Sequence, residues 1–293
     1  MRDRNPFLSL IPFDSNVQRF DITQNRFIET QKLEAKLDYF YLLNDQSNIN
    51  LSIGFTNVAQ NYLSDFNQTL DDGTTKSFDD EQFNNNVDFS FKDLYFALNY
   101  RIRTGIFTID PGLTLHFYDN KNTQLGQTFA KDISDIRPNL RVNMQFKKNE
   151  NLRFTYRKNT QFTDVNNISE GYVFNNYNSI FRGNRGLEAA IVNSYNLNYR
   201  SINQFTFTNV YSNISYSKRE NSIQSRAAIE GINSVRTADN SIFPRETYSA
   251  RARLDRRFKN IKINLSANFR YSEFSNIIND CLLYTSDAAD DLL

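Results

Sequence analysis

The sequence predicts an all-β fold, about ten strands of a larger antiparallel transmembrane β-barrel, with no helix-rich domain. Three observations favour it. Apolar and polar residues alternate in ten separate runs, the period of a strand with one apolar face. The connections alternate between short turns and long polar stretches. Each apolar face is roughly ten residues long, the length that a tilted strand needs to cross a bilayer.

The composition excludes several classes of function. The 293 residues contain 34 Lys and Arg against 33 Asp and Glu, a balance that argues against a nucleic-acid binder. One Cys and one His argue against a disulfide framework, a zinc site or a Cys–His catalytic pair. Phosphate-binding loops and nucleophile motifs are missing, so we expect no enzyme, no cofactor and no metal site. No window approaches 18 consecutive apolar residues, and no signal peptide is visible.

The first three strands are expected at 31–43, 49–55 and 87–102. The third run changes parity at Lys92-Asp93, where the apolar positions pass from odd to even numbers. We interpret this change as a β-bulge, since one extra residue inverts the parity, and a tight hairpin is the alternative. The remaining strands are expected at 109–117, 136–146, 152–156, 195–199, 205–216, 248–254 and 261–271, and no segment has a convincing helical pattern.

The connections fall into two classes. Short turns are expected at 44–48, 103–106, 148–151, 201–204 and 256–260, and long polar loops at 61–84, 119–135, 159–191 and 218–246. Loops of that length are uncommon in a compact soluble domain. They are typical of an outer-membrane β-barrel, whose outer face meets lipid and whose lumen is wet. We therefore expect outer-membrane lipid as a partner, no nucleic acid, and a location in the outer membrane of a Gram-negative bacterium.

Aromatic residues near the strand ends predict interfacial girdles. The expected positions are Tyr39, Tyr41, Tyr100, Phe117, Phe146, Tyr156, Tyr199, Tyr216 and Tyr271.

The segment 182–188 resembles the segment that precedes a barrel strand in TonB-dependent receptors. Gly183, Asn184 and Leu187 fit the family pattern, whereas Arg185, Ala189 and Ala190 stand where the family has Pro, Pro and Glu. The stretches 136–140 and 152–157 are similar to the hairpin that comes before this segment in the family, and 110–113 resembles another of its strand starts. The resemblance covers about residues 90–275 and is closest in style to Bacteroidota receptors and their related outer-membrane barrel family.

The resemblance implies a 22-stranded barrel with an N-terminal plug domain, and uptake of a bulky nutrient of the siderophore, glycan or peptide class. It also implies an inner-membrane energy-coupling protein as partner. Neither the plug nor the coupling segment is present in these residues, and a full barrel would need about 600 residues. Two alternatives stay open: a plug-less barrel acting as a passive pore or structural protein, and a soluble β-sandwich binding module.

The last residues differ from the rest. Residues 281–290 resemble a translated sequencing adapter, and a natural frayed C-terminus is the alternative. We therefore expect a partial outer-membrane β-barrel domain over 1–280 and a non-native tail over 281–293, with both natural termini lying beyond this sequence.

Arginines dominate the polar face of the expected strands. Candidates for the lumen lining are Arg137, Arg141, Arg153, Arg157, Arg251 and Arg253, and the same face holds Arg101, Arg103, Arg200 and Arg270. These cations would steer an anionic substrate or contact plug carboxylates, or they are ordinary wet lining, the interpretation we favour.

Two other candidate sites have simpler explanations. His116 lies on a polar face and is more readily a lumenal polar residue than a ligand contact. The acidic stretches 71–72 and 79–81 suggest calcium, but they lack the spacing of oxygen ligands, which favours a solvated loop.

Overall fold

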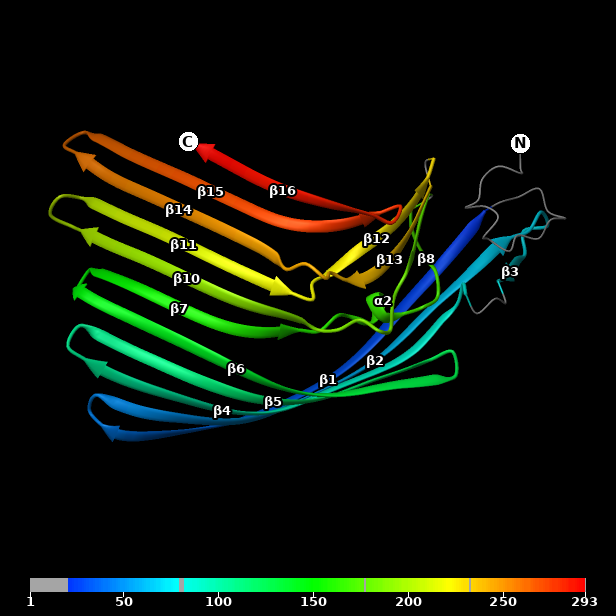
Figure 1. The fold of residues 1–293 in the computed structure, drawn as a ribbon, viewed down its shortest axis with the longest axis horizontal. Coiled ribbons are helices and arrows are strands. Elements are labelled where there is room, and N and C mark those ends of the chain that lie inside the picture. Colours follow the sequence, from blue (N-terminus) through cyan, green and yellow to red (C-terminus); the bar gives the residue numbers. More distant parts are fainter. Residues whose placement is uncertain (1–20, 79–81, 177, 232, 293) are drawn as a thin grey trace.

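A single large sheet dominates the protein. The computed structural model describes residues 21–78, 82–176, 178–231 and 233–292 (Figure 1). Ten long strands follow one another in the sheet in chain order, each antiparallel to the next. They are β1 (Ile22–Asn44), β2 (Ser47–Thr69), β4 (Asn85–Thr104), β5 (Phe107–Gln124), β6 (Gln127–Lys147), β7 (Glu150–Gln161), β10 (Ala190–Asn203), β11 (Thr208–Glu220), β14 (Arg245–Phe258) and β15 (Ile261–Ile278). All ten expected strands are therefore confirmed.

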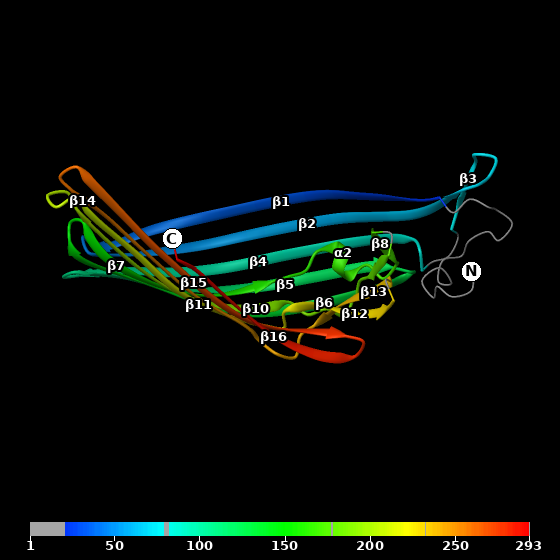
Figure 2. The same cartoon turned by 90° about the horizontal axis from the view of Figure 1, so that it is seen from above.

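Shorter elements gather at one end of the sheet. They are β3 (Thr75–Ser77), α2 (Val165–Ile168), β8 (Val173–Asn176), β9 (Ser179–Arg182), β12 (Ile223–Glu230) and β13 (Asn233–Asn240). Figures 1 and 2 show α2, β8, β12 and β13 at the end opposite the short turns. Two of the pairings are parallel, β12 with β15 and β13 with β9. The four-residue α2 is the one helix among the described residues, where the sequence indicated none.

The sheet is curved and open. Within the described residues β1 pairs with β2 alone, and the strand order ends at β8 on the other side. There is one sheet rather than two packed sheets, so the alternative of a soluble β-sandwich is wrong.

The short turns all lie at the same end of the sheet, on the left in Figure 1. They occupy 45–46, 105–106, 148–149, 204–207 and 259–260. The fourth turn lies later than expected, so Phe205 and Phe207 belong to the turn and not to a strand. The Asn203 side chain explains the shift, because its Oδ1 accepts hydrogen bonds from the backbone N–H of Phe205 and Thr206 at 3.0 Å each.

The long polar loops are for the most part strands. β5 and β6 continue through 119–135 to a tight turn at Leu125-Gly126, where Gly126 has φ of +68°. β2 continues to Thr69, and the 218–246 stretch contains the hairpin of β12 and β13. The expectation of a long loop was therefore wrong for 119–135, for 218–246 and for the first part of 61–84, whereas 162–172 and 183–189 of the fourth stretch contain no strand. Backbone pairing continues where the apolar alternation stops, because a hairpin outside the membrane needs no lipid-facing side chains.

The parity change at Lys92-Asp93 is neither a β-bulge nor a hairpin. β4 pairs with β2 in unbroken register from Asn85 to Ile102. The apolar residues change face instead: Phe89 points inward and is 8% exposed, whereas Leu98 points outward and is 47% exposed. Near the short turns the outer face is apolar, and toward the other end the inner face is covered by the segment 162–187. Each half of the strand is apolar on the side that is away from water.

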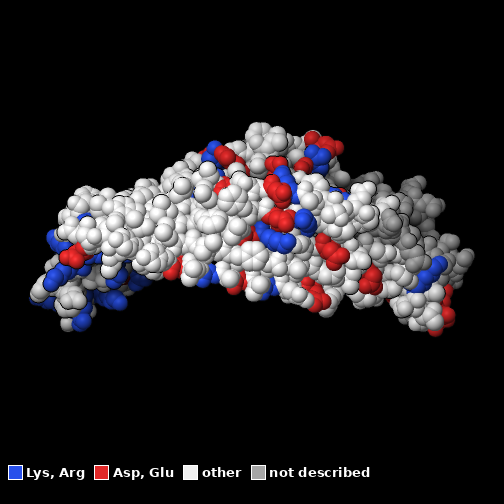
Figure 3. Space-filling model, turned by 90° about the horizontal axis from the view of Figure 1, so that it is seen from below, with Lys and Arg blue, Asp and Glu red and all other residues white. Residues whose placement is uncertain are grey.

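The outer face carries an exposed apolar belt. Its residues include Leu51, Ile53, Phe55, Leu94, Phe96, Leu98, Leu113, Leu115, Phe117, Ile136, Ile214, Leu265 and Phe269. Figure 3 shows a broad surface without charge near the short-turn end, with Lys and Arg at the tip and mixed charges over the other half. So large an apolar surface is incompatible with water and matches the hydrocarbon layer. No helix among the described residues has the length and apolarity to cross a membrane.

A row of tyrosines marks the border of this belt on the side away from the short turns. Tyr156, Tyr195, Tyr216, Tyr248 and Tyr271 occupy the same register position on five adjacent strands. Their neighbouring ring centroids are 4.8, 5.8, 4.8 and 6.3 Å apart. The hydroxyl of Tyr156 donates to Asn193 and that of Tyr248 to Glu246, both on the side away from the short turns. Apolar rings with wet hydroxyls are suited to a bilayer interface.

The C-terminal strand β16 (Cys281–Leu292) pairs antiparallel with β15. Its sequence has no strand period, but the free edge of β15 offers backbone donors and acceptors to any extended segment.

Candidate functional site

The inner face of the sheet is the face opposite the apolar belt, and it is polar along most of its length. It carries Ser52, Gly54, Asn139 and His116, and two hollows of about 320 and 670 Å³ open on it. The first is lined by β1, β2, β4, β5, β6 and β7, and the second by β7, β10, β11, β14 and β15. In a closed barrel this polar face would line the lumen, so it is the candidate functional site.

Two of the four cations that line the first hollow are neutralised by neighbouring carboxylates. Lys36 Nζ lies 2.9 Å from Asp38, and Arg101 Nε lies 2.6 Å from Asp110. Each of these two cations has its carboxylate on the same or the adjacent strand, whereas Arg141 and Arg157, which also line this hollow, have no ion-pair partner among the described residues.

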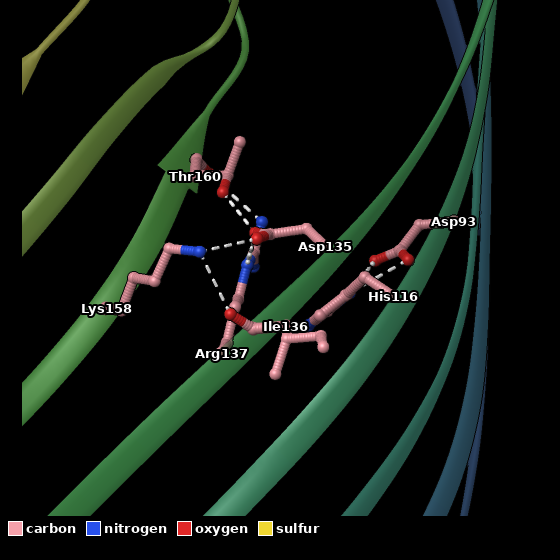
Figure 4. A network of polar contacts seen from close by, with 7 residues as sticks. All are labelled: Asp93, His116, Asp135, Ile136, Arg137, Lys158 and Thr160. Atoms are coloured by element: carbon pink, nitrogen blue, oxygen red, sulfur yellow. Dashed lines mark hydrogen bonds and ion pairs between the residues drawn. The ribbon is translucent and has the colours of Figure 1, made fainter.

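A polar network joins β6 to β7 where their backbones separate (Figure 4). The two strands pair from the short turn only as far as Asn139 and Arg157. Beyond that point Asp135 accepts hydrogen bonds from Lys158 at 2.8 Å, from Arg137 at 3.0 Å and from Thr160. Lys158 also donates to the Ile136 carbonyl at 3.0 Å, and Arg137 to the Thr160 carbonyl at 3.3 Å. Side chains thus take over the role of the missing backbone ladder.

His116 lies beside this network, on β5. Its Nδ1 is 2.9 Å from Asp93, and its ring stacks on Tyr118 with centroids 5.2 Å apart. The guanidinium of Arg137 lies over the other ring, 5.4 Å from the Tyr118 centroid. Groups of three or more metal-ligating side chains are missing from the described residues. His116 is therefore a packed, hydrogen-bonded wall residue in this structure.

The structure places the six candidate arginines on the inner face, in two different settings. Arg137 belongs to the network above, and Arg253 is 3.0 Å from Asp255. The other four, Arg141, Arg153, Arg157 and Arg251, have no ion-pair partner among the described residues, and neither does Arg200.

The motif residues Gly183, Asn184 and Leu187 hold the segment 162–187 over the inner face. The Gly183 N–H donates to the Ser169 carbonyl at 2.8 Å, and the Asn184 N–H to the Asn167 carbonyl at 2.7 Å. A Cβ at Gly183 would lie 2.5 Å from the Ser169 carbonyl oxygen, so only glycine allows this approach. Asn184 Oδ1 accepts from the Gly186 N–H at 2.8 Å, which shapes the turn to Leu187.

An apolar core anchors this segment, which we call the cap. Val165 and Ile168 of α2 pack with Tyr62, Val87 and Phe89 of the sheet. Burial raises the pKa of the Tyr62 phenol, which lies in the wall above the belt. A second cluster unites Phe66, Phe78, Phe83 and Ile180. The cap is therefore packed against the wall as a protein core would be.

The acidic loop has a structural role in its described part. Asp72 Oδ1 accepts hydrogen bonds from the Thr74 hydroxyl at 2.7 Å and the Thr74 N–H at 2.9 Å, and these hold the pKa of the Asp72 carboxyl below its usual value. Residues 79–81, the other half of the calcium candidate, lie outside the described residues.

Sequence reasoning missed Asp135, Lys158 and Thr160. Their signal is positional: Asp135 directly precedes the apolar run 136–146, and Lys158 directly follows Tyr156-Arg157 at the end of its run. A sequence pattern does not reveal that the two strands separate between these points.

Solved structures with a similar fold include two receptors and a transporter. The hemophore receptor HasR of Serratia marcescens, solved with its hemophore HasA and heme, has a TM-score of 0.58 at 12% identity over 86% of this chain and 43% of its own. The copper transporter OprC has a TM-score of 0.60 at 12% identity over 85% and 38%. The siderophore receptor PiuA of Acinetobacter baumannii has a TM-score of 0.53 at 11% identity over 89% and 41%. The chain thus spans less than half the length of these proteins.

Sequence comparison assigns the family. No curated protein matches the chain. The model of the outer membrane protein beta-barrel family matches residues 4–287, nearly the whole sequence. With its lipid-facing belt, its tyrosine row and its polar inner face, the chain belongs to the outer membrane protein beta-barrel family and is a protein of the Gram-negative outer membrane.

Proposed function

We propose that the chain forms part of the barrel wall of a TonB-dependent receptor, which imports a bulky nutrient across the outer membrane. The main observation in support is the similarity in fold to HasR, in which 86% of this chain matches 43% of the receptor. The polar inner face supports the same proposal, because an imported solute needs a wet path past a wall whose outside is apolar.

The proposal includes two partners. One is a plug domain that fills the completed barrel, and the other is an inner-membrane protein that provides energy for import. Within the described residues one edge of β1 is unpaired, which supports further barrel strands beside it, because an unpaired edge cannot face lipid. The role proposed is transport without any chemical conversion of the solute.

Resequencing the source DNA across both ends of the reading frame tests this proposal. A frame that continues upstream into a signal peptide and plug, and downstream past residue 280 into more alternating strands, supports the receptor. A frame that starts at Met1 and stops near 293 contradicts it. The same reads decide our proposal that 281–293 is a non-native tail, because an adapter will be missing from independent reads.

Conductance separates the receptor from a passive pore. The full-length protein in planar bilayers is expected to stay essentially closed, because a plug fills the lumen. A steady conductance of the folded protein would favour the plug-less pore instead.

A further inference from the structure

The wall built by β6, β7, β10, β11, β14 and β15 has an unusual charge. The segments 140–156, 195–216 and 248–271, which lie between the tyrosine row and the short turns, contain 12 of the 34 Lys and Arg but only two acidic residues. Both acids are engaged, Glu150 with Lys147 at 3.3 Å and Asp255 with Arg253 at 3.0 Å. Since the whole chain has a net charge of +1, positive charge is segregated into this wall.

The cations on its inner face are arranged in register. Arg153, Asn198, Asn213, Arg251 and Asn268 occupy one row across five adjacent strands, each opposite the next. One step nearer the short turns, Arg200, Tyr211 and Arg253 form a second row. Strand spacing puts Arg153 and Arg251 about 14 Å apart.

Both rows line the hollow of about 670 Å³. Arg153, Arg200 and Arg251 have no carboxylate partner among the described residues, in contrast to Lys36 and Arg101 of the other hollow. The Asn213 amide donates to Asn198 Oδ1 at 2.7 Å, so the amides between the arginines are held in position. Several guanidinium groups and amides that converge on one hollow present many hydrogen-bond donors and an uncompensated positive field.

We propose that this hollow binds a small polyanion, a molecule with two or more carboxylate or phosphate groups, as the substrate that the barrel admits. The inference rests on the proposed function and adds the substrate class to it. Two anionic groups that are up to about 14 Å apart engage arginines from both rows at once. The first hollow has two arginines without an ion-pair partner among the described residues, Arg141 and Arg157, against three here, so we expect it to bind such a ligand more weakly.

The test uses the full-length protein purified from outer membranes in a non-ionic detergent. Equilibrium dialysis measures retention of labelled tripolyphosphate, of citrate, and of sucrose as the neutral probe. We expect retention of at least one of the two polyanions and none of sucrose, with phosphate and carboxylate chemistry separated by the two arms. Retention is expected to weaken as ionic strength rises from about 0.01 to 0.15 M, because the Debye length falls from about 30 to 8 Å.

The variant Arg153→Gln/Arg200→Gln/Arg251→Gln removes three unpaired cations without stranding a carboxylate. We expect the affinity for the retained polyanion to fall about tenfold per arginine. The control Lys92→Gln/Lys121→Gln/Lys218→Gln changes the charge equally on the outer face and is expected to change affinity less than twofold. The Lys variants of the three arginines are expected to restore part of the affinity, because the charge is kept.

Three results would overturn the inference. The first is that no polyanion is retained by folded wild-type protein. The second is an equal loss of affinity in both triple variants. The third is that the arginine variant retains the polyanion as well as wild-type protein does, while its plug loses protection from protease. That result would mean that the arginines contact carboxylates of the plug and not the substrate. A protein that neither fractionates with outer membranes nor shifts its gel mobility on heating refutes the proposed function itself, and this inference falls with it.

Discussion

At Gly183 the cap can pack only if the side chain is no larger than a hydrogen atom. Its Cα lies against the backbone of Asn167 and Ser169, so a methyl group would push α2 off the sheet. We expect Gly183→Ala in the full-length protein to destabilise the cap by about 1–3 kcal/mol. The measurement is the rate of external proteolysis within 162–187 on whole cells.

Gly186→Ala is the matched control for that experiment. A Cβ there would come no closer than 3.1 Å, and only to the flexible Asn184 side chain. Equal cleavage rates in the two variants would show that the close approach at Gly183 does not hold the cap.

Asp135 is the centre of the network between β6 and β7. Its side chain is 11% exposed, and Lys158 and Arg137 both depend on it. Replacing it with Asn leaves two half-buried cations without a counter-charge, so we expect Asp135→Asn to cost about 1–3 kcal/mol. Asp239→Asn, which breaks an exposed pair of 3.6 Å, is expected to cost under about 1 kcal/mol. Urea unfolding of the full-length protein in vesicles compares them, and equal midpoints would contradict the assignment.

At the scale of the element, the two faces of β4 have opposite requirements. Leu98 points outward from the middle of the belt, and Asn99 points inward. We expect Leu98→Lys to destabilise the barrel by about 2–4 kcal/mol, because the ammonium lies in hydrocarbon, and Asn99→Lys to be nearly neutral. Urea titration in vesicles measures both. A larger cost at Asn99 would reverse our assignment of the faces.

The tyrosine row gives a second element-scale prediction. Tyr195 stacks between Tyr156 and Tyr216, whereas Tyr156 stands at the end of the row. We expect Tyr195→Leu to be more destabilising than Tyr156→Leu by about 0.5–1.5 kcal/mol, the value of one aromatic pair. The same unfolding assay decides it, and the reverse order would mean that stacking contributes little to the row.

The strands could be predicted from alternation because lipid and water impose a period of two on either side of the belt. Outside the belt that signal changes meaning. Phe89 and Phe91 continue the alternation on the other face, since the cap supplies their apolar surroundings. The cap and α2 depend on contacts between residues far apart in the chain, such as Asn85 with Gly171, 86 positions away, which no local pattern encodes.

The arginines of the site were visible in sequence, but their pairing was not. Parity places Arg101 and Arg153 on the same face. Only the register shows that Arg101 meets Asp110 while Arg153 meets amides of neighbouring strands.

At the scale of the whole molecule, the open sheet has consequences for isolated protein. The edge of β1 is 23 residues long and exposed, and its backbone groups have no partner on one side within the described residues. We expect this chain by itself, refolded in detergent, to aggregate or remain protease-sensitive, because lipid does not satisfy free backbone groups. Size-exclusion chromatography with trypsin digestion measures this. A monodisperse, protease-resistant species would refute the expectation.

The apolar side chains of β4 change from one face of the strand to the other, and the position of this change indicates where the strand leaves the bilayer. Lys92 and Asp93 mark the height at which a strand stops meeting acyl chains and begins to meet its own cap. The part of the sheet beyond that height extends out of the membrane and is built from the same unbroken strands. The wall of the sheet is thus ordered on both sides of that height, within the bilayer and beyond it.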